Sequence, residues 1–186
     1  MVILVVSNLS QTNLTDFFQP NDNCTTAKFL RFNLYPDTKV MLSIEQITEV
    51  LKIQLSQIVP IPQMPSWVMG VYNWRGEILW MIDLSHLIGL KPWYQNQTLR
   101  SYHTAIVLSP NQERGDRTDN ICLGLVVSRV EDLATCHTKQ IQSALGSKVG
   151  TRLSNFLQGY WLEPEGEMIL ALDGKAIAAA MPQNFA

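Results

Sequence analysis

The sequence predicts an all-β protein, a sandwich or barrel of short strands with a few short helices. Short apolar segments alternate with turn-forming residues along the chain, which is typical of antiparallel sheets. Hydrophobic residues make up 46% of the 186 residues and charged residues 16%, so the chain can bury a core. A strand followed by an aspartate and a short helix occurs twice, at 80–87 and 170–178. This weak repeat is compatible with two related barrel halves.

Alternation of apolar and polar residues predicts the first hairpin. Over 29–34 the apolar residues at every second position share one face, whereas Arg31 and Asn33 lie on the other. This is the period of a half-buried strand. The Tyr-Pro-Asp-Thr sequence at 35–38 predicts a turn, and 39–44 predicts the returning strand.

The next segments connect this hairpin to a second one. Ile47, Val50 and Leu51 are spaced three and four apart, which indicates either a short helical turn or a bent strand with Glu49 exposed. Three prolines within 58–65 remove backbone donors, so this stretch is predicted to be extended and to lie at an edge or in a connection.

A second hairpin is predicted where two apolar strands flank a short loop that contains glycine. The strands are 68–72 and 78–82, and the loop is 73–77. Gly76 is expected to supply the positive φ angle that such a turn requires.

Two aspartates are predicted to begin short helices at the ends of strands. Asp83 precedes the segment 84–88, which Gly89 is expected to end, and Asp173 precedes 175–181. A pair of catalytic acids is the alternative for these aspartates, but their positions favour N-capping.

The remaining elements are predicted mainly from short apolar runs. Gly124 interrupts one of these runs and indicates a bulge or a barrel corner. We expect strands at 104–108, 121–127 and 168–172, a turn at 163–167, loops or linkers at 90–100 and 110–120, a helical turn at 139–145, a strand region at 155–162 and a mixed segment at 130–136.

The chain is expected to comprise an N-terminal extension, residues 1–27, and one domain, residues 28–186. Residues 7–28 are rich in Asn, Gln, Ser, Thr and Asp and predict a loop or a mobile arm. The apolar run at 1–6 lacks a preceding basic residue and a cleavage site, so it is interpreted as a strand or a docking segment.

Charge and cysteine content exclude some classes of function. The formal net charge of −2 gives no global attraction to nucleic acid or anionic lipid. No apolar run is long enough to span a bilayer, so direct membrane insertion is not expected. The three cysteines, Cys24, Cys122 and Cys136, do not form the pattern of a disulfide scaffold, which favours the reducing cytoplasm.

The sequence lacks the short motifs of common enzymes. It contains no phosphate-binding loop, no G-x-G-x-x-G, no G-x-S-x-G and no H-E-x-x-H. His86, His103, His137, Cys122 and Cys136 lack the compact spacing of metal ligands, so neither a metal nor another cofactor is expected.

The segment 59–84, V-P-I-P-Q-M-P-S-W-V-M-G-V-Y-N-W-R-G-E-I-L-W-M-I-D-L, resembles the signature of the CheW family of chemotaxis adaptors. The segments 47–50, 124–127 and 130–133 resemble further parts of that family, and the similarity covers roughly 28–181. The resemblance implies two SH3-like five-stranded barrels with a groove between them. It also implies a non-enzymatic scaffold that joins the cytoplasmic tip of a methyl-accepting receptor to the regulatory domain of a CheA-type histidine kinase.

Carried over by position, Ile47, Glu49, Arg75 and Leu133 would lie on partner-binding surfaces. From the residues alone, Arg75 could equally be a solvated turn residue, Glu49 a solvated surface residue, and Ile47 and Leu133 core residues. Trp74 is added because a tryptophan on a hairpin loop cannot be fully buried and therefore indicates an interface.

Two other functions remain as alternatives. Small barrels with exposed aromatic residues bind single-stranded nucleic acid, although the net charge disfavours that role here. A hydrolase that uses Cys122 or Cys136 with His103 or His137 is the second alternative, because catalytic groups can come from distant positions in a sequence.

Overall fold

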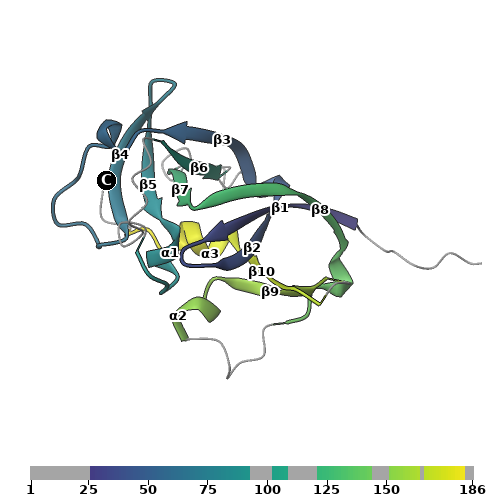
Figure 1. The fold of residues 1–186 in the computed structure, drawn as a ribbon. Coiled ribbons are helices and arrows are strands. Elements are labelled where there is room, and N and C mark those ends of the chain that lie inside the picture. The colour runs from purple at the N-terminus through teal and green to yellow at the C-terminus, as the bar shows by residue number, and fades with distance from the viewer. Residues whose placement is uncertain (1–25, 93–101, 109–120, 144–150, 164–165, 183–186) are drawn as a thin grey trace, which may run out of the picture.

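The computed structural model describes residues 26–92, 102–108, 121–143, 151–163 and 166–182. These residues form two five-stranded sheets, and each sheet curls into an SH3-like barrel (Figure 1). The prediction of an all-β protein with two barrels and a few short helices is therefore confirmed. Residues 1–25, most of the expected extension, lie outside the described residues, as do the linker residues 93–100 and the loop 110–120.

Barrel A is built from the two ends of the domain. Its strands follow the order β8-β1-β2-β10-β9, in which β10 pairs with β2 in parallel and the other neighbours are antiparallel. The strands are β1 (Thr26–Leu34), β2 (Thr38–Ser43), β8 (Arg129–His137), β9 (Leu157–Leu162) and β10 (Met168–Leu172).

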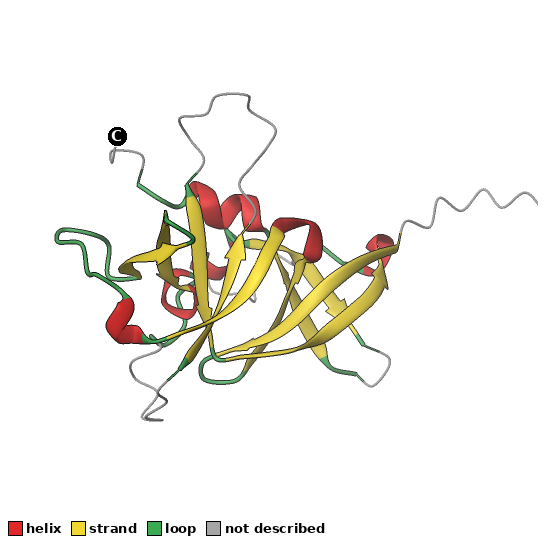
Figure 2. Cartoon of the chain, turned by 90° about the horizontal axis from the view of Figure 1, so that it is seen from above, coloured by secondary structure: helices red, strands yellow, loops and turns green. Residues whose placement is uncertain are grey.

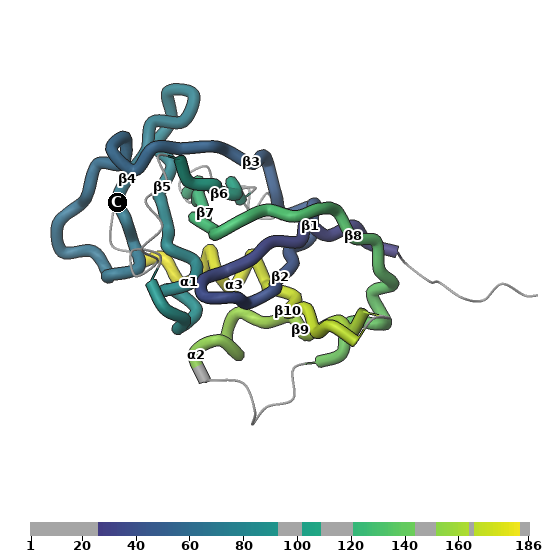
Figure 3. Tube along the Cα trace, in the orientation of Figure 1, coloured from purple at the N-terminus to yellow at the C-terminus, as the bar shows by residue number. Residues whose placement is uncertain are grey.

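Barrel B is formed by the chain between β2 and β8, as the tube in Figure 3 shows. Its strand order is β3-β6-β7-β5-β4, with β5 and β7 parallel. The strands are β3 (Ile47–Ile53), β4 (Val68–Trp74), β5 (Glu77–Asp83), β6 (His103–Leu108) and β7 (Cys122–Val127).

The helices are short, and strands make up most of the molecule (Figure 2). As predicted, the side chain of Asp83 accepts a hydrogen bond from His86 N–H at the start of α1, and Asp173 accepts one from Lys175 N–H at the start of α3. The α-helices are α1 (Leu84–Leu87), α2 (Thr151–Ser154) and α3 (Gly174–Ala179), and the 3-10 helices are η2 (Ile44–Gln46), η3 (Leu55–Gln57) and η5 (Thr138–Gln140).

Three apolar clusters hold the fold together. The largest, which we call the shared core, takes buried side chains from both sheets and from α1 and α3. In barrel A it includes Leu30, Phe32 and Leu34 of β1, and in barrel B it includes Leu123 and Leu125 of β7. Because these side chains pack in one cluster, the two barrels are joined by a continuous hydrophobic core.

Each barrel also has an interior of its own. Phe29, Met41 and Ile169 pack with other residues inside barrel A, whereas Met81 and Val107 belong to the interior cluster of barrel B. Along β1, therefore, Phe29 faces the interior of barrel A and Leu30 faces the shared core, as alternation requires.

The β4–β5 hairpin is tighter than predicted. Trp74 pairs with Glu77, so only Arg75 and Gly76 form the turn. Both have positive φ, 55° and 87°, which is the signature of a two-residue type I′ turn. Gly76 thus has the predicted conformation, and Arg75 shares it without the steric freedom of glycine.

Gly124 is not at a β-bulge, so the bulge predicted there was wrong. Strand β7 pairs with β5 in continuous register on both sides of Gly124, and its pairing with β6 runs without a shift from Val127 to Gly124. A Cβ at this position would lie 2.8 Å from Met81 Sδ and 3.0 Å from Leu79 Cδ2. The glycine is needed because neighbouring core side chains approach its backbone closely.

Several other boundaries and elements differ from the expectations. Strand β1 begins at Thr26, which pairs with His137, so 26–28 are not part of a loop. The segment 47–51 is a bent strand rather than a helical turn, since β3 has a register shift between Ile47 and Glu49. The mixed segment 130–136 belongs to the nine-residue strand β8. The helical turn expected at 139–145 is instead η5, which ends at Gln140, and α2 was not predicted.

None of the helices in the described part of the chain has the length and apolar character needed to cross a bilayer.

Candidate partner-binding site

Three of the five residues named from the sequence meet in one place, which we call the hairpin cluster: Glu49, Trp74 and Arg75. The indole Nε1–H of Trp74 donates to Glu49 Oε1, and the Arg75 guanidinium donates to Glu49 Oε2 at 2.5 Å. The same guanidinium lies over the Trp74 ring, with 5.3 Å between its central carbon and the ring centroid. Glu49 is on β3 and Trp74 on β4, the two edge strands of barrel B. The cluster therefore links the free edges of this sheet through side chains.

The hairpin cluster presents charge to solvent on an ordered support. The Arg75 side chain is 69% exposed, whereas the Glu49 side chain that anchors it is 23% exposed. A guanidinium has five N–H donors, and the hydrogen bond to Glu49 uses one of them. Arg75 can therefore bind a carboxylate of another molecule while Trp74 and Glu49 fix its orientation.

Leu133 lies on β8 of barrel A, whereas the hairpin cluster lies on the other sheet, in barrel B. It is 61% exposed, although its partner on β1 is Leu30, a residue of the shared core. Directly paired residues of antiparallel strands point to the same face. Leu133 therefore marks the place where the shared core reaches the surface.

Ile47 is not a surface anchor of the same kind. It is half-buried at the start of β3 and packs against the shared core. It lies two residues before Glu49, and the register shift of β3 falls between them. Ile47 thus connects the shared core to the strand that carries the hairpin cluster.

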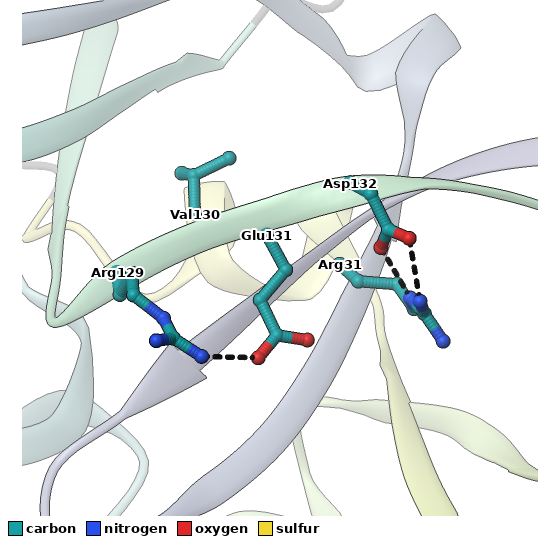
Figure 4. Close-up of a pocket in the computed structure, with 5 residues that line it drawn as sticks. All are labelled: Arg31, Arg129, Val130, Glu131 and Asp132. Atoms are coloured by element: carbon teal, nitrogen blue, oxygen red, sulfur yellow. Dashed lines mark hydrogen bonds and ion pairs between the residues drawn. The ribbon is translucent and has the colours of Figure 1, made fainter.

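A charged cluster on barrel A was missed by the sequence analysis. Arg31 donates from Nε and Nη2 to the two carboxylate oxygens of Asp132, both at 2.6 Å, and from Nη1 to Glu163. Beside this pair, Glu131 Oε1 accepts a hydrogen bond of 2.9 Å from Arg129 (Figure 4) and another of 2.9 Å from Asn33. Most of these residues line an open depression, and the placement of Arg31 and Asn33 on one strand face was the only sequence signal of it.

The ion pairs shift the protonation equilibria of the acids. The hydrogen bond from Arg31 lowers the pKa of Asp132, and hydrogen bonds from Arg129 and Asn33 lower the pKa of Glu131 against the opposing effect of burial. The pKa of Arg31 is raised, chiefly by its bond to Asp132. Arg31, Glu131 and Asp132 therefore keep their charges over the physiological pH range.

The described cysteines lack the features of an activated nucleophile. Burial raises the pKa of the Cys122 and Cys136 thiols, which favours the neutral form. Cys136 is buried inside barrel A with Phe29 and Met41. Within the described residues, no group of three or more His, Cys, Asp or Glu side chains could hold a metal ion. These observations do not favour the hydrolase alternative.

The tryptophans in the described part of the chain do not form a platform for nucleic-acid bases. Trp67 is buried in the shared core, Trp161 packs against the interior cluster of barrel A, and Trp80 packs against the shared core. Trp74 is half-buried and bonded to a carboxylate. Stacking of successive bases requires open aromatic faces along a basic surface, so the nucleic-acid alternative is not favoured either.

The molecule thus consists of two SH3-like barrels around a shared core, with an exposed charged cluster on barrel B and an exposed apolar side chain, Leu133, on barrel A. The family model of the CheW-like domain matches residues 28–181, and the chain therefore belongs to the CheW-like domain family. A search of curated proteins gave no match.

Among solved structures, the chain is similar to the scaffolding protein TtCheW from Thermoanaerobacter tengcongensis. The TM-score is 0.63 and the sequence identity is 22%, and the match covers 80% of this chain and 90% of the other. Identity at this level supports a shared fold, but it does not identify the partners of this chain.

Proposed function

We propose that this protein is a non-enzymatic cytoplasmic adaptor that couples a methyl-accepting receptor to a CheA-type histidine kinase in chemotaxis, twitching or phototaxis. The family match over residues 28–181 is the observation that carries this proposal. Proteins of this family are scaffolds that interact with receptors and CheA. The domain at 28–186 is the adaptor, with Thr26 and Ala27 added to it by strand β1, and the preceding residues form an extension.

The hairpin cluster is the proposed docking site for the regulatory domain of the kinase. It lies at the edges of barrel B, where Arg75 projects from a tight turn and is held by Glu49 and Trp74. A preoriented arginine beside an aromatic ring is a typical energetic centre of a protein interface, since little side-chain entropy remains to be lost on binding. The expected partner group is a carboxylate within a shallow apolar surface.

The exposed edge of the shared core is the proposed site for the cytoplasmic tip of the receptor. Leu133 offers an exposed apolar side chain at this edge, and Ile47, half-buried against the shared core, is the second apolar residue assigned to the surface. The family resemblance implies that the receptor tip is helical, and a helix docks through apolar side chains on one of its faces. The exposed anchors of the two surfaces, Leu133 on barrel A and Arg75 on barrel B, then belong to different parts of one body, and both partners can bind together.

The kinase site is tested by comparing two arginines in similar surroundings. Arg75 is 69% exposed and paired with Glu49, and Arg129 is 67% exposed and paired with Glu131. Calorimetric titration with the purified regulatory domain of the CheA-type kinase from the same cell should show at least tenfold weaker binding for Arg75→Ala, a loss of about 1.4 kcal/mol.

The Arg129→Ala variant is the control and should bind the kinase domain like the wild type. Equal affinities for the wild type and both variants would contradict the assignment of the hairpin cluster. An equal loss for both variants would indicate a general electrostatic effect and would also contradict it.

A further inference from the structure

Strand β8 contains a β-bulge next to Leu133. Leu30 of β1 pairs with Leu133, and Phe32 of β1 pairs with Val130. Between these two pairs, the single β1 residue Arg31 therefore lies opposite two residues of β8, the segment 131–132. A bulge of this kind interrupts the alternation of side chains along the strand.

The bulge places two successive carboxylates on one face. Val130 packs against the shared core, and Leu133 pairs with a shared-core residue, so both belong to the opposite face. Figure 4 shows Val130 on one side of the strand, with Glu131 and Asp132 on the other. If the bulge were lost and the strand slipped by one residue, Leu133 would turn away from the edge of the shared core.

Arg31, on the neighbouring strand β1, stabilises this bulge through hydrogen bonds to Asp132. Its two parallel hydrogen bonds to Asp132, both 2.6 Å, fix the orientation of the carboxylate as well as its distance from the guanidinium. Nη1 also donates to Glu163, the residue that follows β9. Asn33, two residues along β1, donates to the other carboxylate, Glu131. Arg31 thus connects the bulge in β8 to β1 and to Glu163, the residue that follows β9.

We propose that Arg31 is a positioning residue for receptor binding: through Asp132 it fixes the bulge that presents Leu133 to the receptor tip. This inference rests on the proposed function, and specifically on Leu133 as a receptor contact. Arg31 itself has only 23% of its side chain exposed, and its guanidinium is engaged with acids of the same chain, so it acts through Leu133 rather than by contacting the partner.

The test is a double-mutant cycle on the affinity for a purified receptor signalling tip. We expect Leu133→Ala to weaken binding at least tenfold and Arg31→Gln to weaken it threefold or more. In the Leu133→Ala background, Arg31→Gln should have no further effect, because the side chain that it positions is gone. Arg31→Lys keeps the charge but loses the two-pronged geometry, so it should also weaken binding.

Two controls separate positioning from loss of fold. Lys39→Gln removes the ion pair between Lys39 and Glu167 in the same barrel. The charge of Lys39 also acts on Glu131, but the variant keeps the hydrogen bonds of Arg31 and Asn33 to the bulge, so it should leave receptor affinity unchanged. The Arg31 variants should retain wild-type affinity for the kinase domain, since the hairpin cluster is on barrel B. If Arg31→Gln fails to fold, Asp132→Asn replaces it, because this substitution changes the same contact at a side chain that is 57% exposed.

The outcomes distinguish this inference from the proposed function. If Leu133→Ala binds the receptor tip normally, the proposed receptor surface is wrong, and the role of Arg31 falls with it. If Leu133→Ala weakens binding but the Arg31 and Asp132 variants do not, only the positioning role is overturned. Additive losses in the double variant would also overturn it, since Arg31 would then act independently of Leu133.

Discussion

At the scale of single residues, some positions require glycine because another part of the backbone lies too close to leave room for a side chain. Gly70 has φ of 137°, and a Cβ there would lie 2.2 Å from the carbonyl oxygen of Val59. Val59 and Val71 exchange two backbone hydrogen bonds across the same contact, so the backbone cannot move away without losing them. Gly76 also has positive φ, 87°, but a Cβ there would meet no atom of the described residues within 4 Å.

These two glycines give a matched pair of substitutions. We expect Gly70→Ala to lower the free energy of unfolding by about 3 kcal/mol or more, because strain and a backbone clash combine. Gly76→Ala should cost only about 1–2 kcal/mol, the cost of placing an ordinary residue in the left-handed region. Urea denaturation measures both values. Similar losses for the two variants would show that the contact with Val59 is not a constraint.

The residues of the candidate site could be named from the sequence, but their relations could not. Arg75, Glu49, Ile47 and Leu133 were identified by family resemblance, and Trp74 by its place on a hairpin. The bond from Trp74 to Glu49 joins residues 25 apart in the chain and depends on how the edges of barrel B meet. The pattern of apolar and polar residues within a segment cannot show which distant segments meet when the barrel closes.

At the scale of secondary-structure elements, the β4–β5 hairpin shows a conflict between stability and binding. Arg75 has φ of 55°, a conformation that costs an ordinary residue roughly 1–2 kcal/mol, whereas asparagine accepts it readily. The sequence Asn-Gly is also the preferred pair for a type I′ turn. The arginine is therefore a poor turn residue at a position where the proposed function requires a guanidinium.

Arg75→Asn should separate these two properties. The exposed ion pair with Glu49 contributes about 0–1 kcal/mol to folding stability, so relief of the backbone strain at residue 75 should offset its loss. The midpoint of thermal unfolding should therefore not fall. Affinity for the kinase domain should nevertheless drop at least tenfold. Calorimetry measures both quantities on one sample. A destabilised variant that binds the kinase normally would contradict the interpretation of the turn.

The elements that the sequence predicted correctly are those with unbroken local patterns. The hairpin at 68–82 combines two apolar strands with a glycine turn, and both aspartate caps precede short helices. Strand β8 was not recognised because the bulge places Glu131 and Asp132 side by side and so breaks the alternation. The shift is stabilised by Arg31, about a hundred residues earlier, which no local window includes.

At the scale of the whole molecule, the shared core determines how the two proposed surfaces are related. Buried residues of both sheets, with α1 and α3, pack in one cluster, so the barrels cannot be separated without exposing it. The hairpin cluster on barrel B and Leu133 on barrel A are therefore held in a fixed arrangement. A scaffold needs this property, because it must present two partners to each other in one geometry.

We propose that one rigid body binds both partners at once through different surfaces. Analytical ultracentrifugation of the full chain with the kinase regulatory domain and the receptor tip tests it most directly. We expect one species containing all three proteins, with Arg75→Ala releasing the kinase domain and Leu133→Ala releasing the receptor tip. Only binary complexes, with each partner displacing the other, would contradict the account.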